Sequence, residues 1–116
     1  MELYSWDTVK KEVLNEKIWR KVVSGEKAMI AQVFIAKDGV VPTHQHESEQ
    51  ISYALEGALR MELEGKEVVL HHGDLLCIAS QVPHRAVALE DYFGLDIFSP
   101  IRIDWLTGTD DYLRKG

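Results

Sequence analysis

The sequence predicts an all-β protein built as a sandwich or a barrel. Short apolar and β-branched runs recur at roughly 8–12-residue spacing, with turn-forming residues between them. Three successive runs each end at a glycine, and helical features are confined to the two ends of the chain. At 116 residues the chain is long enough to bury one modest core, so we expect residues 1–116 to form a single domain.

The predicted strands cover most of the chain between residues 17 and 100. The turn-forming stretch SGEK separates the first two, and Pro42 marks the third as an edge, bulged or bent strand, because proline cannot donate a ladder hydrogen bond. The second run, AMIAQVFIA, is apolar enough to indicate a strand that is covered on both faces. In order, the predicted strands are 17–25, 28–36, 39–46, 50–57, 58–65, 66–73, 74–80, 85–91 and 94–100.

Helices are expected only at the ends of the chain. Residues 5–13 are expected to carry one helical turn, and a short C-terminal helix is expected from about Asp110, where an acidic start precedes a basic finish. The first ten residues, MELYSWDTVK, are polar, so we expect neither a signal peptide nor a membrane anchor there.

The charge balance and the cysteine count exclude several classes of function. Thirteen Lys and Arg against nineteen Asp and Glu give a net charge of -6, which disfavours nucleic acid and anionic membranes as partners. Cys77 is the only cysteine, so a disulfide framework and a zinc site of several thiolates are excluded. We expect Cys77 to be a small buried apolar residue, and we expect the protein to be cytoplasmic.

Two histidines one residue apart, His44 and His46, are the first candidate metal ligands. On an extended segment both imidazoles point to the same side, because side chains alternate with period 2. The same alternation places Gln50 and Ser52 on that side and Glu49 on the other, unless a bulge shifts the phase by one residue. Imidazole is the commonest protein ligand for transition metals, so this segment is a candidate metal site.

The remaining histidines fall into two groups. His84 begins another predicted strand, in SQVPHRAVAL, and is the third candidate ligand. His71 and His72 precede a glycine in a turn, where adjacent side chains point apart, so we expect them at the surface or in support of the site. A third histidine favours the metal site over the alternative of a surface histidine pair.

Two stretches around these histidines resemble the two motifs of the cupin superfamily. GVVPTHQHESEQISYALEG is similar to the first motif, with its glycine, its histidine pair, an acidic or amide residue four positions on, and a closing glycine. GDLLCIASQVPHRAV is similar to the second motif, with its glycine, proline and histidine. The resemblance implies a single cupin barrel, a double-stranded β-helix of the jelly-roll type, with a short C-terminal helix.

A narrower resemblance lies near the C-terminus. LDIFSPIRIDWLTGTDDYL is similar to the closing segment of small cupins of the pectin-degradation type, which open cyclic 4,5-unsaturated uronates into linear keto-uronates. That group also carries glutamine at the position of Gln50. The resemblance implies one divalent transition metal ion, with Ni, Zn, Mn and Fe as candidates, and a small anionic sugar acid as substrate. The implied metal ligands are His44, His46, Gln50 and His84, and the implied catalytic and substrate-binding residues are Asp96, Phe98 and Arg102.

The strand pattern gives independent support for the implied catalytic and substrate-binding residues. Asp96, Phe98 and Arg102 are all even-numbered, so an extended strand carries them on one face. A strand with acidic and basic residues on one face and apolar residues on the other suits the wall of a ligand cavity. The alternative is an exposed Asp96–Arg102 ion pair beside a partly buried Phe98. We expect Ser52, or alternatively Tyr53, to add a hydrogen bond to the substrate.

Gln50 also bears on the type of chemistry. Three neutral imidazoles and a neutral amide leave a divalent ion its full formal charge of about +2, which makes it a stronger Lewis acid. Such a site is less like the two-histidine, one-carboxylate site of iron oxygenases. We therefore expect an enzyme that rearranges its substrate. A metal-dependent dioxygenase and a non-catalytic cupin that binds a small ligand are the two alternatives.

The apolar run at 28–36 bears on assembly. A small barrel covers both faces of such a strand most easily when a second subunit packs against it. Small cupins commonly dimerise through their sheets, so the resemblance points the same way. We expect a homodimer with no nucleic-acid or membrane partner.

Overall fold

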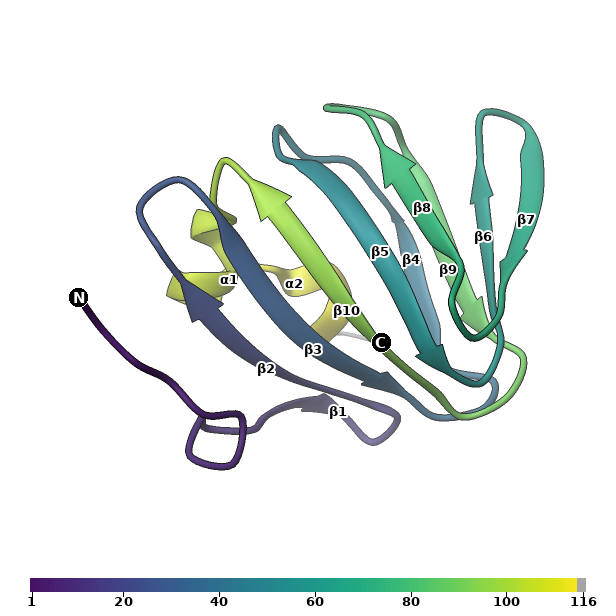
Figure 1. Cartoon of the computed structure of the whole chain (residues 1–116). Helices are drawn as coiled ribbons and strands as arrows, with labels where there is room; N and C mark the ends of the chain where they lie inside the picture. The colour runs from purple at the N-terminus through teal and green to yellow at the C-terminus, as the bar shows by residue number, and fades with distance from the viewer. Residues whose placement is uncertain (115–116) are drawn as a thin grey trace.

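Two antiparallel sheets make up the fold in the computed structural model, which describes residues 1–114 (Figure 1). The larger sheet has six strands in the order β1-β2-β3-β10-β5-β8, and the smaller has four in the order β4-β9-β6-β7. The all-β prediction is confirmed, and each predicted strand overlaps one strand of the structure. The strands are β1 (Glu12–Asn15), β2 (Ile18–Ser24), β3 (Met29–Ile35), β4 (Val40–His44), β5 (Glu49–Glu56), β6 (Leu59–Leu63), β7 (Lys66–Leu70), β8 (Leu75–Ile78), β9 (His84–Ala88) and β10 (Tyr92–Ser99).

A shared hydrophobic core joins the two sheets. Along β3 every second residue is buried, from Met29 to Ile35, which is the period that one covered face of a sheet requires. The same core contains Met61 of β6 and Ala86 of β9, which belong to the smaller sheet. The intervening residues of β3 are only partly buried within the described chain, so its second face is still half open to solvent.

Strand β4 runs along an edge of the smaller sheet and is irregular. It pairs with β9 through Val40, Val41 and His44, and its register shifts between Val41 and His44, where Pro42 lies. The prediction of an edge strand with a bulge or bend at Pro42 is therefore confirmed. The bulge brings His44 opposite His84 on β9, which places two candidate ligands on neighbouring strands.

The chain after β10 differs from the prediction. Strand β10 ends at Ser99, so Arg102 does not share a strand face with Asp96 and Phe98 but lies just before α1 (Ile103–Thr107). Pro100 accounts for the break, because it lacks an N–H and restricts the residue before it. Helix α1 was not expected; it ends at Gly108, whose φ of 70° is the left-handed conformation common at helix C-termini.

The C-terminal helix expected from about Asp110 is confirmed as α2 (Asp111–Arg114). The last part of that predicted segment, residues 115–116, lies outside the described residues. At the other end, the Val9 N–H donates to the Ser5 carbonyl at 3.1 Å and closes a turn, but residues 12–13 belong to β1 and not to a helical segment. No helix among the described residues is both long enough and apolar enough to cross a membrane.

The expectation that Cys77 is buried is wrong, because its side chain is exposed. Cys77 lies on β8, an edge strand of the larger sheet, where Ile78 pairs with Gln50 and points inward. Its neighbour Cys77 therefore points outward, as alternation along a strand requires. The apolar residues on both sides of Cys77 in the sequence concealed which face of the strand it occupies.

Candidate metal centre

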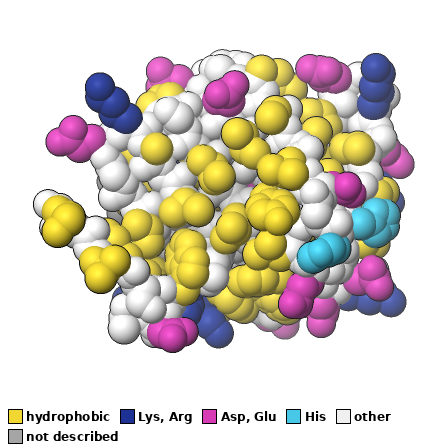
Figure 2. Space-filling view, viewed as in Figure 1, with side chains coloured by type: hydrophobic (Ala, Val, Ile, Leu, Met, Phe, Trp, Pro, Cys, Tyr) yellow, Lys and Arg dark blue, Asp and Glu magenta, His cyan; other side chains and the backbone are white. Residues whose placement is uncertain are grey.

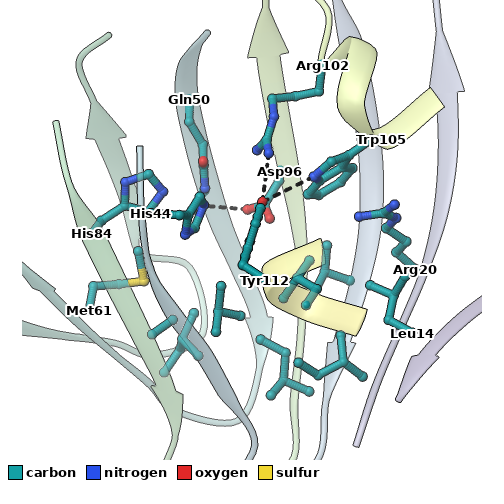
Figure 3. Close-up of a pocket in the computed structure, with 18 of the residues that line it drawn as sticks. Leu14, Arg20, His44, Gln50, Met61, His84, Asp96, Arg102, Trp105 and Tyr112 are labelled. Atoms are coloured by element: carbon teal, nitrogen blue, oxygen red, sulfur yellow. Dashed lines mark hydrogen bonds between the residues drawn. The ribbon is translucent and has the colours of Figure 1, made fainter. Parts of the chain in front are cut away.

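Three histidines from two neighbouring strands meet at one end of the interior. His44 ends β4 and His84 begins β9 (Figure 3), and His46 follows β4 two residues after His44. One ring nitrogen of each lies within 4.8 Å of the others, close enough for all three to bind one ion. The predicted convergence of these histidines is therefore confirmed. The alternation of side chains and the bulge in β4 together produce it.

Each of the three imidazoles is fixed by a hydrogen bond to the backbone. In every case the Nδ1 atom donates to the carbonyl of a residue two positions away, which leaves Nε2 unprotonated. Because a carbonyl oxygen only accepts hydrogen bonds, this contact selects the tautomer that metal ligation by Nε2 requires. The three Nδ1–O distances are 2.9 Å for His44 to Pro42, 2.8 Å for His46 to Ser48 and 2.8 Å for His84 to Val82.

The histidines are also held in the neutral state. Burial lowers the pKa of His44 to about 3, and the neighbouring His84 adds to that shift. Burial lowers the pKa of His46 to about 4, with the charge of Arg102 as the next cause. Burial lowers the pKa of His84 as well. Neutral imidazole is the ligand form, so the cluster does not need to lose protons near pH 7 before it binds a cation.

Gln50 completes the set of donor atoms. Its Nε2 donates to Ser52 Oγ at 2.9 Å, which turns its Oε1 toward the histidines. Oε1 lies 3.0 Å from Nε2 of His46, and both atoms carry lone pairs when Nδ1 holds the imidazole proton. Two acceptors this close repel each other unless a cation lies between them. Nε2 of His84 is buried and has no hydrogen-bond partner among the described residues, so it too is free for a cation.

The alternation predicted for β5 is confirmed. Gln50 and Ser52 are buried on the inner face, at 6% and 2% exposure, whereas Glu49 is exposed and points away. The donor set is therefore three imidazole nitrogens and one amide oxygen, a set that suits a divalent transition metal ion. His71 and His72 are both exposed, as expected, and Nδ1 of His72 contacts the Leu55 carbonyl at 2.7 Å outside this cluster.

A carboxyl group joins the histidine cluster through Ser52. The Ser52 hydroxyl accepts from Gln50 and donates to Oδ1 of Asp96 at 2.7 Å. Burial raises the pKa of Asp96 to about 6, although the Ser52 hydrogen bond and the charge of Arg102 oppose the shift. Asp96 is therefore poised to gain or lose a proton near neutral pH.

Arg102 comes from the segment after β10 and lines the same cavity as His44, His84 and Asp96. Its side chain is 3% exposed, and its Nε and Nη2 donate to the two carboxylate oxygens of Asp104 at 3.0 and 2.7 Å. The alternative of an exposed Asp96–Arg102 ion pair is therefore wrong. Nη1 of Arg102 is buried without a partner among the described residues, so one donor is available to a ligand. Phe98, 1% exposed, lies beneath the guanidinium at 5.3 Å and beside the His46 ring at 5.7 Å.

The cavity also includes residues that the sequence patterns did not single out. Trp105 of α1, Tyr112 of α2 and Arg20 of β2 all line it (Figure 3). Arg20 occupies an inward position of β2, two residues after the buried Ile18, and a charged residue at such a position was a usable signal. Trp105 and Tyr112 had no such signal, because their places depend on how the C-terminal segment folds back.

Residues 31–92 match the family model described as a cupin domain, and this stretch contains all four donor residues. The chain belongs to the cupin family. The three-histidine cluster and the family together indicate a metal-binding cupin that takes a divalent ion. The jelly-roll barrel that the resemblance implied is thus confirmed for this cupin.

Particular relatives of this cupin are known. The pectin degradation protein KdgF of Dickeya dadantii is 33% identical over 98 residues, which cover 82% of this chain and 89% of that protein. The solved structure of KdgF from a Halomonas species is 34% identical, with a TM-score of 0.83 over 90% of this chain and 99% of that one. An RmlC-like cupin from Shewanella frigidimarina, 24% identical with a TM-score of 0.85 over 90% of this chain and 96% of its own, shares the fold.

Proposed function

We propose that this cupin is a metal-dependent isomerase that opens 4,5-unsaturated uronates into linear keto-uronates. The observation that carries the proposal is the hydrogen-bonded row Gln50–Ser52–Asp96, which links the histidine cluster to a carboxyl group able to exchange protons. The similarity to a pectin degradation protein supports this choice, because unsaturated uronates are products of pectin cleavage by lyases.

The proposed metal ligands are Nε2 of three histidines and Oε1 of Gln50. When bound, a divalent ion with four neutral ligands supplies Lewis acidity toward a hydroxyl or carboxylate oxygen of the substrate. The chain fixes these donors before binding, through the three Nδ1 hydrogen bonds and the bond from Gln50 to Ser52. The ligands are His44, His46, His84 and Gln50.

The proposed reaction rearranges bonds without consuming a second reactant. The hemiacetal bond between C1 and the ring oxygen breaks as a proton moves from the C1 hydroxyl to the ring oxygen, which gives an aldehyde and an enol. The enol then loses its hydroxyl proton and gains one on C4, which gives a ketone. Asp96 is the proposed acid and base for these transfers, because its pKa of about 6 lets it both accept and donate near neutral pH.

The substrate is proposed to bind beside Arg102 and Phe98, which both line the cavity. Nη1 of Arg102 is a charged donor with no partner among the described residues, and a uronate carboxylate satisfies it with a charge-assisted hydrogen bond. Phe98 offers an apolar surface for the sugar ring. Ser52 is already bonded to Gln50 and Asp96, so we assign it the task of positioning Asp96 and not that of a direct substrate contact.

The test is a turnover assay on protein of measured metal content. Unsaturated monouronates freshly released by a polysaccharide lyase are added, and loss of their conjugated ultraviolet absorbance is followed against the spontaneous reaction. We expect acceleration by the loaded protein and a loss of about a hundredfold or more in Asp96→Asn. No acceleration with metal bound contradicts the proposal.

Two further measurements separate the alternatives named above. An oxygen electrode detects consumption of O₂, which a dioxygenase requires and an isomerase does not. Calorimetric binding of a uronate without any change in its absorbance identifies a ligand-binding cupin. In that case, substitutions at Asp96 and Arg102 change affinity alone.

We also propose that the protein forms a homodimer through the outer face of the larger sheet. Aligned residues make an uncharged row across five strands of this face: Val23, Ile30, Ile97, Ile51 and Cys77. Figure 2 shows hydrophobic side chains gathered across the middle of this face, with charged groups toward its edges. A broad apolar face with a charged rim is typical of a subunit interface.

A further inference from the structure

Helix α2 has only four residues and is held in place by side chains on the barrel. A helix this short is not stable by itself. Asp110, immediately before it, is 1% exposed and accepts from Nη1 of the buried Arg20 at 2.6 Å. Arg114 at its end donates to Glu12 at 2.8 Å, and the Leu113 carbonyl accepts from Nδ2 of Asn15 at 3.0 Å. The position of α2 on the cavity is therefore set from both ends.

Tyr112 lies between these anchors and contacts both the histidine cluster, through His44, and the proposed substrate-binding residue Arg102. Its ring stacks on the His44 imidazole, with 4.3 Å between ring centroids and 17° between ring planes. Its hydroxyl oxygen accepts from Nη2 of Arg102 at 2.7 Å and from Nε1 of Trp105 at 3.4 Å. In Figure 3 these two contacts converge on the Tyr112 hydroxyl from above and from the side.

The hydroxyl proton of Tyr112 is left available. A phenol hydroxyl can both accept and donate hydrogen bonds, and here its oxygen already accepts from Arg102 and Trp105. No acceptor for the proton is found among residues 1–114, and Tyr112 lines the cavity. The free O–H thus lies next to the Arg102 guanidinium, which is proposed to bind a carboxylate. A sugar acid bound at Arg102 places its oxygen atoms near this O–H.

We propose that Tyr112 is a further residue of this site, which positions His44 and Arg102 and donates its free hydroxyl proton in a hydrogen bond to an oxygen atom of a bound sugar acid. The inference rests on the proposed function for the nature of the ligand. The inference also assigns a role to α2, because this helix carries Tyr112, which contacts both the proposed metal ligand His44 and the proposed substrate-binding residue Arg102.

The experiment compares Tyr112→Phe and Tyr112→Ala with the matched control Tyr53→Phe. Tyr53 lies on the same strand as Gln50 but is paired with Leu95 and Leu75 and does not line the cavity. Three quantities are measured: Ni²⁺ affinity of the metal-free protein by calorimetry, affinity of the loaded protein for D-galacturonate as a saturated uronate, and kcat and KM with unsaturated uronate. Thermal unfolding confirms that each variant is folded.

Tyr112→Phe keeps the ring stack and removes the hydroxyl. We expect its Ni²⁺ affinity to stay within about twofold of the wild type, while galacturonate affinity falls and KM rises, each by roughly tenfold. Tyr112→Ala also removes the stack on His44, so we expect Ni²⁺ affinity to fall further, by roughly threefold to tenfold. Tyr53→Phe leaves all three quantities unchanged.

The outcomes separate this inference from the proposed function. If the wild type turns over uronate and Tyr112→Phe matches it in KM and galacturonate affinity, the inference is wrong and the function stands. If the wild type binds galacturonate without turnover and Tyr112→Phe weakens that binding, the inference stands and the proposed reaction fails. If the wild type binds no galacturonate, the ligand contact is refuted. An unchanged Ni²⁺ affinity in a folded Tyr112→Ala refutes the positioning of His44.

Discussion

At the scale of single residues, the neighbour Ser52 decides which way the Gln50 amide faces. Ser52 donates to Asp96, so its oxygen must accept, and it accepts from the NH₂ group of Gln50. The amide oxygen is thereby turned to the histidines. One hydroxyl thus fixes both a neutral oxygen donor for an ion and the position of a carboxyl group that shares the cavity.

Replacing this amide with a carboxylate tests what its neutrality does. In Gln50→Glu the bound ion carries about one unit less net charge, so we expect tighter Ni²⁺ binding but a kcat at least about tenfold lower. Calorimetry and uronate turnover measure the two effects. Glu49→Gln, one position away on the exposed face, is the control and changes neither. A Gln50→Glu variant with undiminished kcat contradicts the role assigned to the neutral ligand.

Asp96 gives a pH dependence of stability with a defined sign. Its pKa rises from the ordinary value of 3.8 to about 6 in the folded protein, because burial disfavours the charged form. At pH values between 3.8 and about 6, folding is therefore accompanied by uptake of a proton at Asp96. The contribution of Asp96 to stability falls as pH rises through this window. Above it the partly buried carboxylate costs up to about 3 kcal/mol, as two pK units imply.

Asp96→Asn removes this cost, since it cannot ionise. For metal-free protein we expect the variant to match the wild type near pH 4 and to exceed it by about 2–3 kcal/mol near pH 7. Urea unfolding at a series of pH values gives the difference, in which the shared contribution of the histidines cancels. If the difference in the free energy of unfolding between variant and wild type does not change with pH, the pKa of Asp96 is not raised by folding and the prediction is wrong.

At the scale of elements, the ion pair between β2 and the start of α2 is the main tertiary anchor of the C-terminal segment. Arg20 and Asp110 are both about 1% exposed, and Arg20 also stacks on Trp105 at 4.0 Å. Neutralising Asp110 leaves the buried Arg20 with Glu12, at 2.6 Å, as its remaining carboxylate partner, so we expect Asp110→Asn to lower the free energy of unfolding by about 2–3 kcal/mol.

The matched control is an ion pair on the surface of the smaller sheet. Glu62 accepts from Arg85 at 2.7 Å, and both side chains are about one third exposed. We expect Glu62→Gln to change stability by less than about 1 kcal/mol. Urea unfolding of both variants decides the matter, and equal losses in the two contradict the anchoring role of Asp110.

The sequence predicted those elements whose side chains follow a simple local rule. Alternation with period 2 placed Gln50, Ser52 and Glu49 correctly, and Pro42 marked an irregular edge strand. The same rule failed at Arg102, because Pro100 breaks the strand that the rule assumes. Tyr112 was out of reach of any local pattern, since its position depends on ion pairs with residues about 90–100 positions earlier in the chain.

At the scale of the whole molecule, the two faces of the larger sheet are given different tasks. The inner face carries the polar groups of the cavity, whereas the outer face carries the uncharged row through Ile30, Ile97 and Ile51. The outer aromatic residues add to this face, with Trp19 stacked on Phe34 at 5.7 Å. The site therefore lies on the opposite side of this sheet from the surface proposed for dimerisation.

A charge placed in the middle of the outer row tests the dimer. Ile97 is 38% exposed and lies on β10, a central strand of the sheet. We expect sedimentation to find the wild type as a dimer at micromolar concentration and Ile97→Lys as a monomer, because an interface excludes an unpaired charge. Val68→Lys, equally exposed on the smaller sheet, stays dimeric. A monomeric wild type contradicts the proposal.

The outward turn of Cys77 gives the protein a built-in chemical reporter. It is the only thiol in the chain, it is exposed, and it ends the row of residues on the outer face. A maleimide dye added to the native protein therefore labels one known position without any engineering. We expect the labelling rate to report whether that face is covered: it should be fast in a separated subunit and slow in the proposed dimer, and should therefore fall as protein concentration rises.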